Sequence, residues 1–164
     1  MNGHAVPSPA QEGLHELLGG ERRYQVVRKL GQGGMAEVFL CTMFSGDEFR
    51  RPVAVKIVRD DFAKRPEFCE LFAQEARFAA MLLHPNIVNV LDFSRDAQGR
   101  LFLVMEYIEG VDLWQLAAGR ALPPSVAIHI AAEVLHGLDY AHRLPHGSEV
   151  RGIVHRDVSP PSWI

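Results

Sequence analysis

The chain has 164 residues, of which 48% are apolar and 23% charged, so it can bury a core in one domain or two small lobes. A net charge of -3 without any basic block argues against a nucleic-acid-binding surface. The two cysteines, Cys41 and Cys69, are far apart and the eight histidines form no ligand pair, which argues against a disulfide framework or a zinc site. No apolar leader and no run of about 18 apolar residues is found, so we expect a cytoplasmic chain without a membrane span.

The first half of the chain predicts a flexible lead followed by strands. Residues 1 to about 22 are polar and rich in proline and glycine, and they allow a short helix near residues 15–18. Short β-rich runs separated by glycine-containing turns then predict an antiparallel meander at 24–30, 36–43 and 51–58.

A helix and two more strands are predicted next. Pro66 suits a first helical position, and residues 66–83 carry apolar side chains at helical spacing. The residues on that apolar face are Phe68, Leu71, Phe72, Ala79 and Leu82. Residues 87–93 and 100–108 then have the composition of two strands joined by a turn.

Helices are expected beyond Gly110. Residues 112–119 predict a short helix, with Asp112 as its N-cap, and residues 125–144 predict a longer one. The apolar stripe of the longer helix is Ala127, Ile130, Val134, Leu138 and Ala141. This order predicts an α+β fold in which a five-stranded antiparallel β lobe with one inserted helix (residues 23–105) precedes the start of a helical lobe (residues 106–164).

A glycine-rich string, Gly31-Gln32-Gly33-Gly34-Met35-Ala36, lies between two predicted strands. Taken alone, it is most simply a tight hairpin. A dinucleotide-binding fingerprint would need a helix after it, and the Gly-Lys-Ser/Thr of a Walker loop is absent. A glycine hairpin can also fold over phosphates and offer them backbone N–H groups, so both interpretations stay open at this point.

Lys56 and Glu75 are two charges in apolar surroundings. Alternation divides the strand around Lys56 into two faces, Ala54, Lys56 and Val58 on one and Val53, Val55 and Ile57 on the other. Such a lysine needs an anionic partner, unless it lies in an edge strand and reaches water. Glu75 lies on the apolar face of the predicted helix, so an ion pair between Lys56 and Glu75 would account for both charges in apolar surroundings. Such a pair would also hold Lys56 in a position to meet phosphate oxygens.

Two further features follow in the chain. Residues 103–110 run from a strand into an extended connection whose backbone groups could meet an adenine edge, although alone it is an ordinary loop. His155-Arg156-Asp157 follows an apolar triplet and precedes Ser159-Pro160, so we expect a loop that presents Asp157. An aspartate can accept and orient a substrate hydroxyl.

These features, taken in order, resemble protein kinases over about residues 24–160. The matching segments are LGQGGMAEV at 30–38, VAVK at 53–56, Glu75, LVMEYIEG at 103–110 and HRDVSP at 155–160. The last of these looks most like bacterial serine/threonine kinases of the eukaryotic type. The resemblance implies a protein-kinase-like fold and transfer of the ATP γ-phosphate to a protein hydroxyl. Val-Ser-Pro stands where many serine/threonine kinases have Leu-Lys, so the hydroxyl preference is inferred from the general pattern.

The resemblance also implies roles for the matching residues. Lys56 would hold the ATP phosphates and pair with Glu75, and Asp157 would be the catalytic base. Met105 would be the gatekeeper, and Asp112 would lie near the ribose. The other implied nucleotide contacts are the phosphate loop at Gly31, Gly33 and Ala36, the adenine cover at Leu30, Val38 and Ala54, and backbone bonds from Glu106 and Ile108.

The resemblance stops abruptly after Pro160. The family's magnesium-binding Asn, five residues after Asp157, is Ser162 here, and no Asp-Phe-Gly follows. Mg²⁺ is therefore expected for the family, but its ligand positions are missing or altered. This indicates a truncated or frameshifted gene product, and we expect the 164 residues to transfer little phosphate.

Three functional hypotheses follow. The first is a serine/threonine kinase by family, with ATP and a protein of unknown identity as its substrates. The second is a nucleotide-binding regulatory module that engages a partner kinase. The third is a gene fragment without a settled fold.

Overall fold

The computed structural model describes residues 16–19, 22–46, 49–118, 121–144 and 152–153. Contacts divide the chain into two compact units. The first comprises Met1–Arg77 and Val90–Tyr107, and the second comprises Phe78–Asn89 and Ile108–Ile164.

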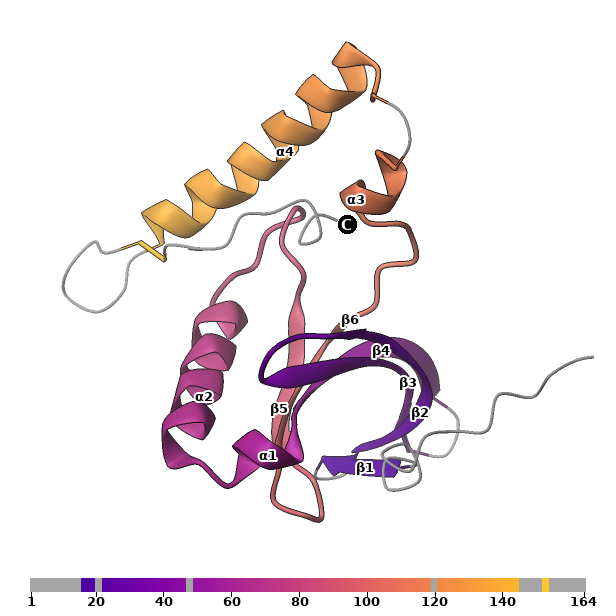
Figure 1. The fold of residues 1–164 in the computed structure, drawn as a ribbon, viewed down its shortest axis with the longest axis vertical. Coiled ribbons are helices and arrows are strands. Elements are labelled where there is room, and N and C mark those ends of the chain that lie inside the picture. Colours follow the sequence, from indigo (N-terminus) through magenta and orange to yellow (C-terminus); the bar gives the residue numbers. More distant parts are fainter. Residues whose placement is uncertain (1–15, 20–21, 47–48, 119–120, 145–151, 154–164) are drawn as a thin grey trace, which may run out of the picture. The chain divides into compact units, whose positions relative to one another are not determined.

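The first unit contains a curved antiparallel sheet with helices beside it (Figure 1). Its strands are β1 (Glu16–Gly19), β2 (Arg22–Gln32), β3 (Ala36–Ser45), β4 (Phe49–Val58), β5 (Val90–Arg95) and β6 (Leu101–Glu106). The helices between β4 and β5 are α1 (Asp60–Ala63) and α2 (Pro66–Ala80). The strand order is β1-β2-β3-β4-β6-β5, and β1 at one end of this order also approaches β5 at the other. The predicted α+β architecture is therefore confirmed, with β2 to β6 as the five predicted strands.

Two short elements differ from the sequence prediction. The helix suggested near residues 15–18 is wrong, because Glu16–Gly19 is extended and pairs with β2 from Glu16↔Gln25 to Gly19↔Arg22. An isolated helical turn is marginal in water, whereas a strand gains hydrogen bonds from its neighbour. The single turn α1 was not predicted and is closed by bonds from the N–H groups of Phe62 and Ala63 to the Arg59 carbonyl.

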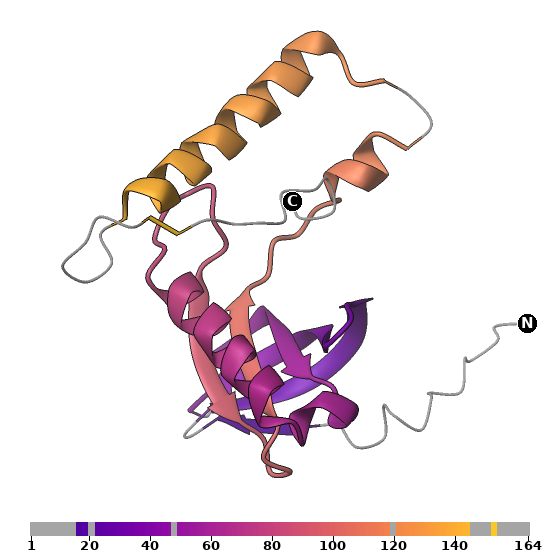
Figure 2. The same cartoon turned by 60° about the vertical axis from the view of Figure 1, so that its left-hand side comes forward.

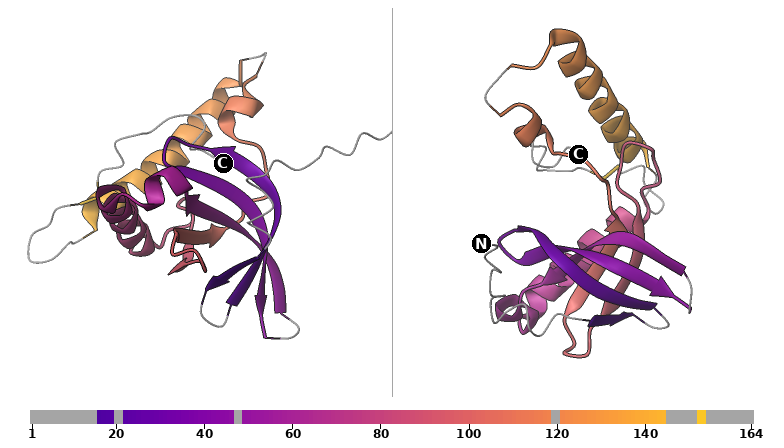
Figure 3. Two further views of the ribbon diagram at one scale, coloured as in Figure 1. Left: turned by 60° about the horizontal axis from the view of Figure 1, so that its bottom comes forward. Right: turned by 90° about the vertical axis from the view of Figure 1, so that its right-hand side faces the viewer.

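Side chains from the two faces of the sheet form two apolar clusters. The first cluster is Tyr24, Phe39, Cys41, Met43, Val53, Val55, Ile57, Phe102 and Val104. The second lies between the sheet and α2 and contains Ala36, Val58, Phe72, Ala76, Leu101 and Leu103. Figures 2 and 3 show α2 lying along the sheet. Because Val53, Val55 and Ile57 belong to the first cluster and Val58 to the second, the predicted alternation along β4 is confirmed.

The buried face of α2 is narrower than the sequence pattern predicted. Phe72 and Ala76 are its buried residues, whereas Leu71 is 53% exposed. The side chains of residues 72 and 76 are therefore the ones that α2 packs against the sheet. This rotation turns Leu71 and Glu75 towards the side of the helix and away from the core.

A buried aspartate organises the turn between β5 and β6. Asp96 Oδ1 accepts hydrogen bonds from the backbone N–H groups of Gln98 (3.0 Å) and Arg100 (2.8 Å). Asp96 Oδ2 accepts one from Arg100 Nε at 2.7 Å, and Arg100 Nη1 bonds Asp60 of α1 at 2.8 Å. Burial alone lowers the pKa of Arg100, but its bonds to Asp96 and Asp60 outweigh burial and raise that pKa. Gly99 completes the turn with a φ of 81°, a conformation that favours glycine.

The second unit contains α3 (Leu113–Leu116), α4 (Pro124–Arg143) and the loop after α2. Asn86 Nδ2 donates to the backbone oxygen and to Oε2 of Glu133, both at 2.8 Å, and the Leu83 N–H donates to the Tyr140 hydroxyl at 3.3 Å. Of the predicted stripe on α4, Ala141 is buried, Ile130, Val134 and Leu138 are half-buried and Ala127 is exposed. None of the helices in the described ranges has the length and apolar content that a membrane span requires.

The cysteines provide a direct test that the first unit is folded. Burial raises the pKa of the Cys41 thiol to about 12, whereas Cys69 is partly exposed. Because the thiolate is the reactive form, iodoacetamide at pH 8 is expected to modify Cys69 alone in the folded chain and both cysteines in urea. Peptide mass spectrometry gives the two extents of modification. Equal labelling without urea would support the third hypothesis, a chain without a settled fold.

Candidate nucleotide-binding site

Lys56 lies in the middle of the sheet, in β4. The strand register places it opposite Val38 of β3 and Leu103 of β6. Val38 in turn lies opposite Gly31 of β2. One row across the sheet therefore joins the start of the glycine string to the lysine, and this row belongs to the face that α2 covers.

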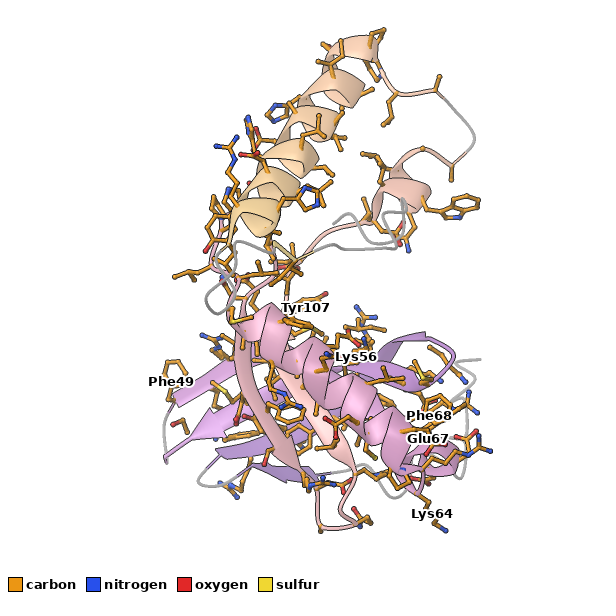
Figure 4. The ribbon with its side chains drawn as sticks, turned by 90° about the vertical axis from the view of Figure 1, so that its left-hand side faces the viewer. Phe49, Lys56, Lys64, Glu67, Phe68 and Tyr107 are labelled. Atoms are coloured by element: carbon orange, nitrogen blue, oxygen red, sulfur yellow. The ribbon has the colours of Figure 1, made fainter. Side chains whose placement is uncertain are left out.

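Glu75 of α2 pairs with Lys56, as the sequence predicted. The Lys56 Nζ to Glu75 Oε1 distance is 2.5 Å, and Nζ lies 5.8 Å from the centroid of the Phe72 ring. Figure 4 shows Lys56 beside α2. The expectation that Glu75 lies on the apolar face of the helix, towards the core, is wrong, since the side chains of Lys56 and Glu75 are 27% and 54% exposed. An ion pair that water reaches can also be reached by a charged ligand.

The glycine string forms the hairpin between β2 and β3. The Gly33 N–H donates to the Ala36 carbonyl at 2.8 Å, and the Arg59 N–H donates to the Met35 carbonyl at 3.1 Å. Gly46 and Gly99 are the glycines with positive φ in the described part of the chain, and a Cβ added at Gly31 or Gly34 would meet nothing within 4 Å. Local backbone geometry therefore does not require glycine at these positions, which weakens the interpretation as a tight turn alone. Their missing side chains leave room for a ligand at the backbone.

Residues predicted to contact the nucleotide lie near this row. Ala54 is two positions from Lys56 on the same face and pairs with Leu40 and Met105. Met105 is half-buried against the second cluster. Leu30 lies at a register shift of β2 and is 37% exposed. Ala36 is 6% exposed and packs inward in the second cluster.

The remaining predicted residues belong to the end of β6, to the second unit or to the part of the chain outside the described ranges. Glu106 ends β6 opposite Val53. Ile108 and Asp112 belong to the second unit, where Ile108 is 40% exposed and Asp112 Oδ1 accepts a hydrogen bond from the Gln115 N–H at 2.7 Å as the N-cap of α3. His155, Arg156, Asp157 and Ser162 lie outside the described residues.

The sequence prediction missed a polar cluster at the base of the hairpin. Lys29 Nζ lies 2.6 Å from Glu37 Oε1 and 2.6 Å from Gln32 Oε1. The signal available in the sequence is a lysine just before the glycine string and a glutamate just after it. A hairpin centred on Gly33 and Gly34 brings these two positions close together.

Comparison with known proteins agrees with this geometry. The sequence model of the family described as "Protein kinase domain" matches residues 24–161. This chain belongs to the protein kinase family. Its similarity extends to the solved PknI kinase domain of Mycobacterium tuberculosis, with a TM-score of 0.64 and 35% identity over 84% of this chain and 52% of that one. The protein-kinase-like fold, with a β lobe and part of a helical lobe, is therefore confirmed.

Curated bacterial kinases match most of the chain. The tyrosine-protein kinase MasK of Myxococcus xanthus is 37% identical over 156 residues, which are 92% of this chain and 24% of MasK. The serine/threonine-protein kinase PrkC of Bacillus subtilis is 38% identical over 139 residues, 84% of this chain and 20% of PrkC. This kinase chain thus spans a quarter or less of the length of these relatives.

Proposed function

We propose that this chain is the ATP-holding part of a protein kinase that transfers the γ-phosphate of ATP to a serine or threonine hydroxyl of a protein. The observation that carries the proposal is the Lys56–Glu75 ion pair, which lies on the same face of the sheet as the start of the glycine hairpin. Protein kinases hold ATP phosphates with such a pair and a glycine-rich loop.

The roles proposed for the first unit follow from their places in the sheet. Lys56, oriented by Glu75, holds phosphate oxygens, and the backbone at Gly31, Gly33 and Ala36 covers the phosphates. The side chains that pack on the adenine are Leu30, Val38, Ala54 and the gatekeeper Met105. These side chains come from β2, β3, β4 and β6, so the strand register fixes their spacing.

The proposed roles beyond β6 rest on the kinase pattern of the sequence. The backbone of Glu106 and Ile108 bonds the adenine edge, Asp112 lies near the ribose, and Asp157 orients the acceptor hydroxyl. Mg²⁺ accompanies ATP in protein kinases and neutralises phosphate charge during transfer. Ser162 stands at the family's Asn position, and we propose that its shorter hydroxyl is a weaker ligand for the ion.

The hydroxyl preference and the cellular setting are also proposals. PrkC is a serine/threonine kinase and MasK a tyrosine kinase by name, so the serine/threonine assignment rests on the overall kinase pattern of the sequence. Two free cysteines suit a reducing cytoplasm, and a net charge of -3 favours a protein over a nucleic acid as the macromolecular partner.

Calorimetric titration with ATP in Mg²⁺ buffer tests the proposed nucleotide site. We expect saturable binding of one ATP by the 164-residue chain. If iodoacetamide modifies Cys69 alone, the first unit is folded. Absence of ATP binding by such a folded chain would overturn the proposal.

A second candidate function is a nucleotide-binding regulatory module. It is favoured by one observation, that the Lys56–Glu75 pair and the glycine hairpin are formed entirely within the first unit. Such a module would bind ATP and act through a partner kinase without transferring phosphate itself.

Phosphotransfer by the purified 164-residue chain tests whether it acts as a kinase by itself. We expect little or no transfer from labelled ATP to a general protein substrate, because the sequence has no Asp-Phe-Gly after Asp157. Vigorous Mg²⁺-dependent transfer that Asp157→Asn abolishes would contradict this expectation and make the chain an active kinase by itself.

A further inference from the structure

We infer that Lys29, Gln32 and Glu37 are positioning residues for the glycine hairpin, which they hold from the face opposite the nucleotide. This inference rests on the proposed function and deepens it, because it concerns how the same ATP site is kept in shape. Lys29 and Gln32 belong to β2 and Glu37 to β3.

The strand register places the three side chains on one face. Lys29 lies opposite Phe39, and Gln32 lies opposite Glu37, which in turn lies opposite Ile57. Phe39 and Ile57 belong to the first apolar cluster, whereas Lys56 lies on the α2 face. The three residues are therefore on the far side of the sheet from Lys56 and do not touch a nucleotide that Lys56 holds.

Two irregularities in β2 make this arrangement possible. Residues three apart in a regular strand point to opposite faces. The register of β2 shifts between Val26 and Arg28 and again between Lys29 and Gly31, so each shift adds one unpaired residue. Val26, Lys29 and Gln32 consequently share one face, and β-bulges of this kind re-aim side chains beside functional sites.

The contacts made by Lys29 join the two strands of the hairpin at its base. Its ammonium lies 2.6 Å from Glu37 Oε1 and 2.6 Å from Gln32 Oε1, so one donor group holds both strands. The side chains of Lys29 and Glu37 are 33% and 20% exposed, so water screens the pair only in part. Just beyond these residues, the Gly33 N–H bonds the Ala36 carbonyl at 2.8 Å. A fixed base limits the conformations of Gly33 and Gly34, whose backbone would otherwise be unusually free.

Two measurements on the 164-residue chain test the inference. The first is ATP affinity by calorimetry, and the second is hydrogen exchange at the Gly33 amide by NMR. Glu37→Gln and Lys29→Met are each expected to weaken ATP binding about three- to fivefold and to speed Gly33 exchange, because each removes the ion pair at the base. Glu70→Gln, which breaks the exposed Arg77–Glu70 pair on α2, is the matched control and should change neither quantity.

Exchange of the two charges gives the decisive result. Lys29→Glu combined with Glu37→Lys is expected to restore both quantities to within about twofold, because the Gln32 amide can donate as well as accept. Rescue would show that the ion pair, and not either side chain alone, sets ATP affinity and Gly33 exchange. If ATP binding and Gly33 exchange were unchanged in the single variants, the inference would be overturned while the proposed function stands. The same holds if the double variant failed to restore the two quantities. Failure of the unaltered chain to bind ATP would overturn both.

Discussion

Lys56→Met is expected to weaken ATP binding by the 164-residue chain about thirtyfold, the largest effect on binding that we predict. The substitution removes the ammonium that lies 2.5 Å from Glu75 and leaves an apolar side chain of similar length. A hydrogen bond between charged groups contributes about 2 kcal/mol, which corresponds to the predicted change in the dissociation constant. Glu75→Gln should weaken binding less, because Lys56 keeps its charge and loses only the group that orients it. Calorimetric titration with ATP measures both effects.

Lys64→Met is the matched control for this experiment. Lys64 is an exposed lysine that follows α1, and Figure 4 shows it well away from Lys56. The same change of side chain at this position should leave ATP affinity unaltered. Equal losses in the two variants would mean that binding depends on overall charge, and equal binding by Lys56→Met and the unaltered chain would remove the basis for the proposed site.

Asp96→Ala is expected to lower the free energy of unfolding by about 3 kcal/mol, the largest effect on stability that we predict. The Asp96 side chain is 1% exposed and that of Arg100 is 12% exposed. The substitution leaves the Arg100 guanidinium with only the exposed Asp60, and it also removes the acceptor for two backbone N–H groups of the turn. Urea unfolding followed by circular dichroism measures the change.

Asp61→Ala tests whether burial causes this effect. Asp61 also pairs with an arginine, Arg59, at 3.1 Å, but its side chain is 56% exposed. Exposed pairs contribute little, so a loss below about 1 kcal/mol is expected. If both variants lost the same stability, the turn around Asp96 would be no more important than a surface ion pair.

The strands of the first unit could be predicted well from the sequence, because a strand is marked by the alternation of side chains within its own few residues. Alternation of apolar side chains along β4 gives the same two faces in the sequence and in the structure. Pairing of Lys56 with Glu75 was also predicted, because each is a charged residue in an otherwise apolar stretch and each needs a partner of opposite charge.

Features that depend on packing between elements could not be predicted in the same way. Helical periodicity groups Leu71, Phe72 and Glu75 on one side of α2 but does not fix how the helix rolls on the sheet. The roll is set by Phe72 and Ala76, and it leaves Glu75 54% exposed. The role of Lys29 depends on two register shifts in β2, and a register shift is a property of the pairing of β2 with β3 rather than of the β2 sequence alone. The residues from 154 onwards, including Asp157, lie outside the described ranges.

The short strand β1 has a consequence for how the chain behaves among copies of itself. It pairs with β2, which would otherwise end the sheet on that side, and it approaches β5 at the other end of the strand order. Unprotected strand ends of a sheet offer unpaired N–H and C=O groups to other chains and promote aggregation. The four residues of β1 cover the first residues of β2, and a version that starts at Arg22 would leave those backbone groups of β2 without their strand partner.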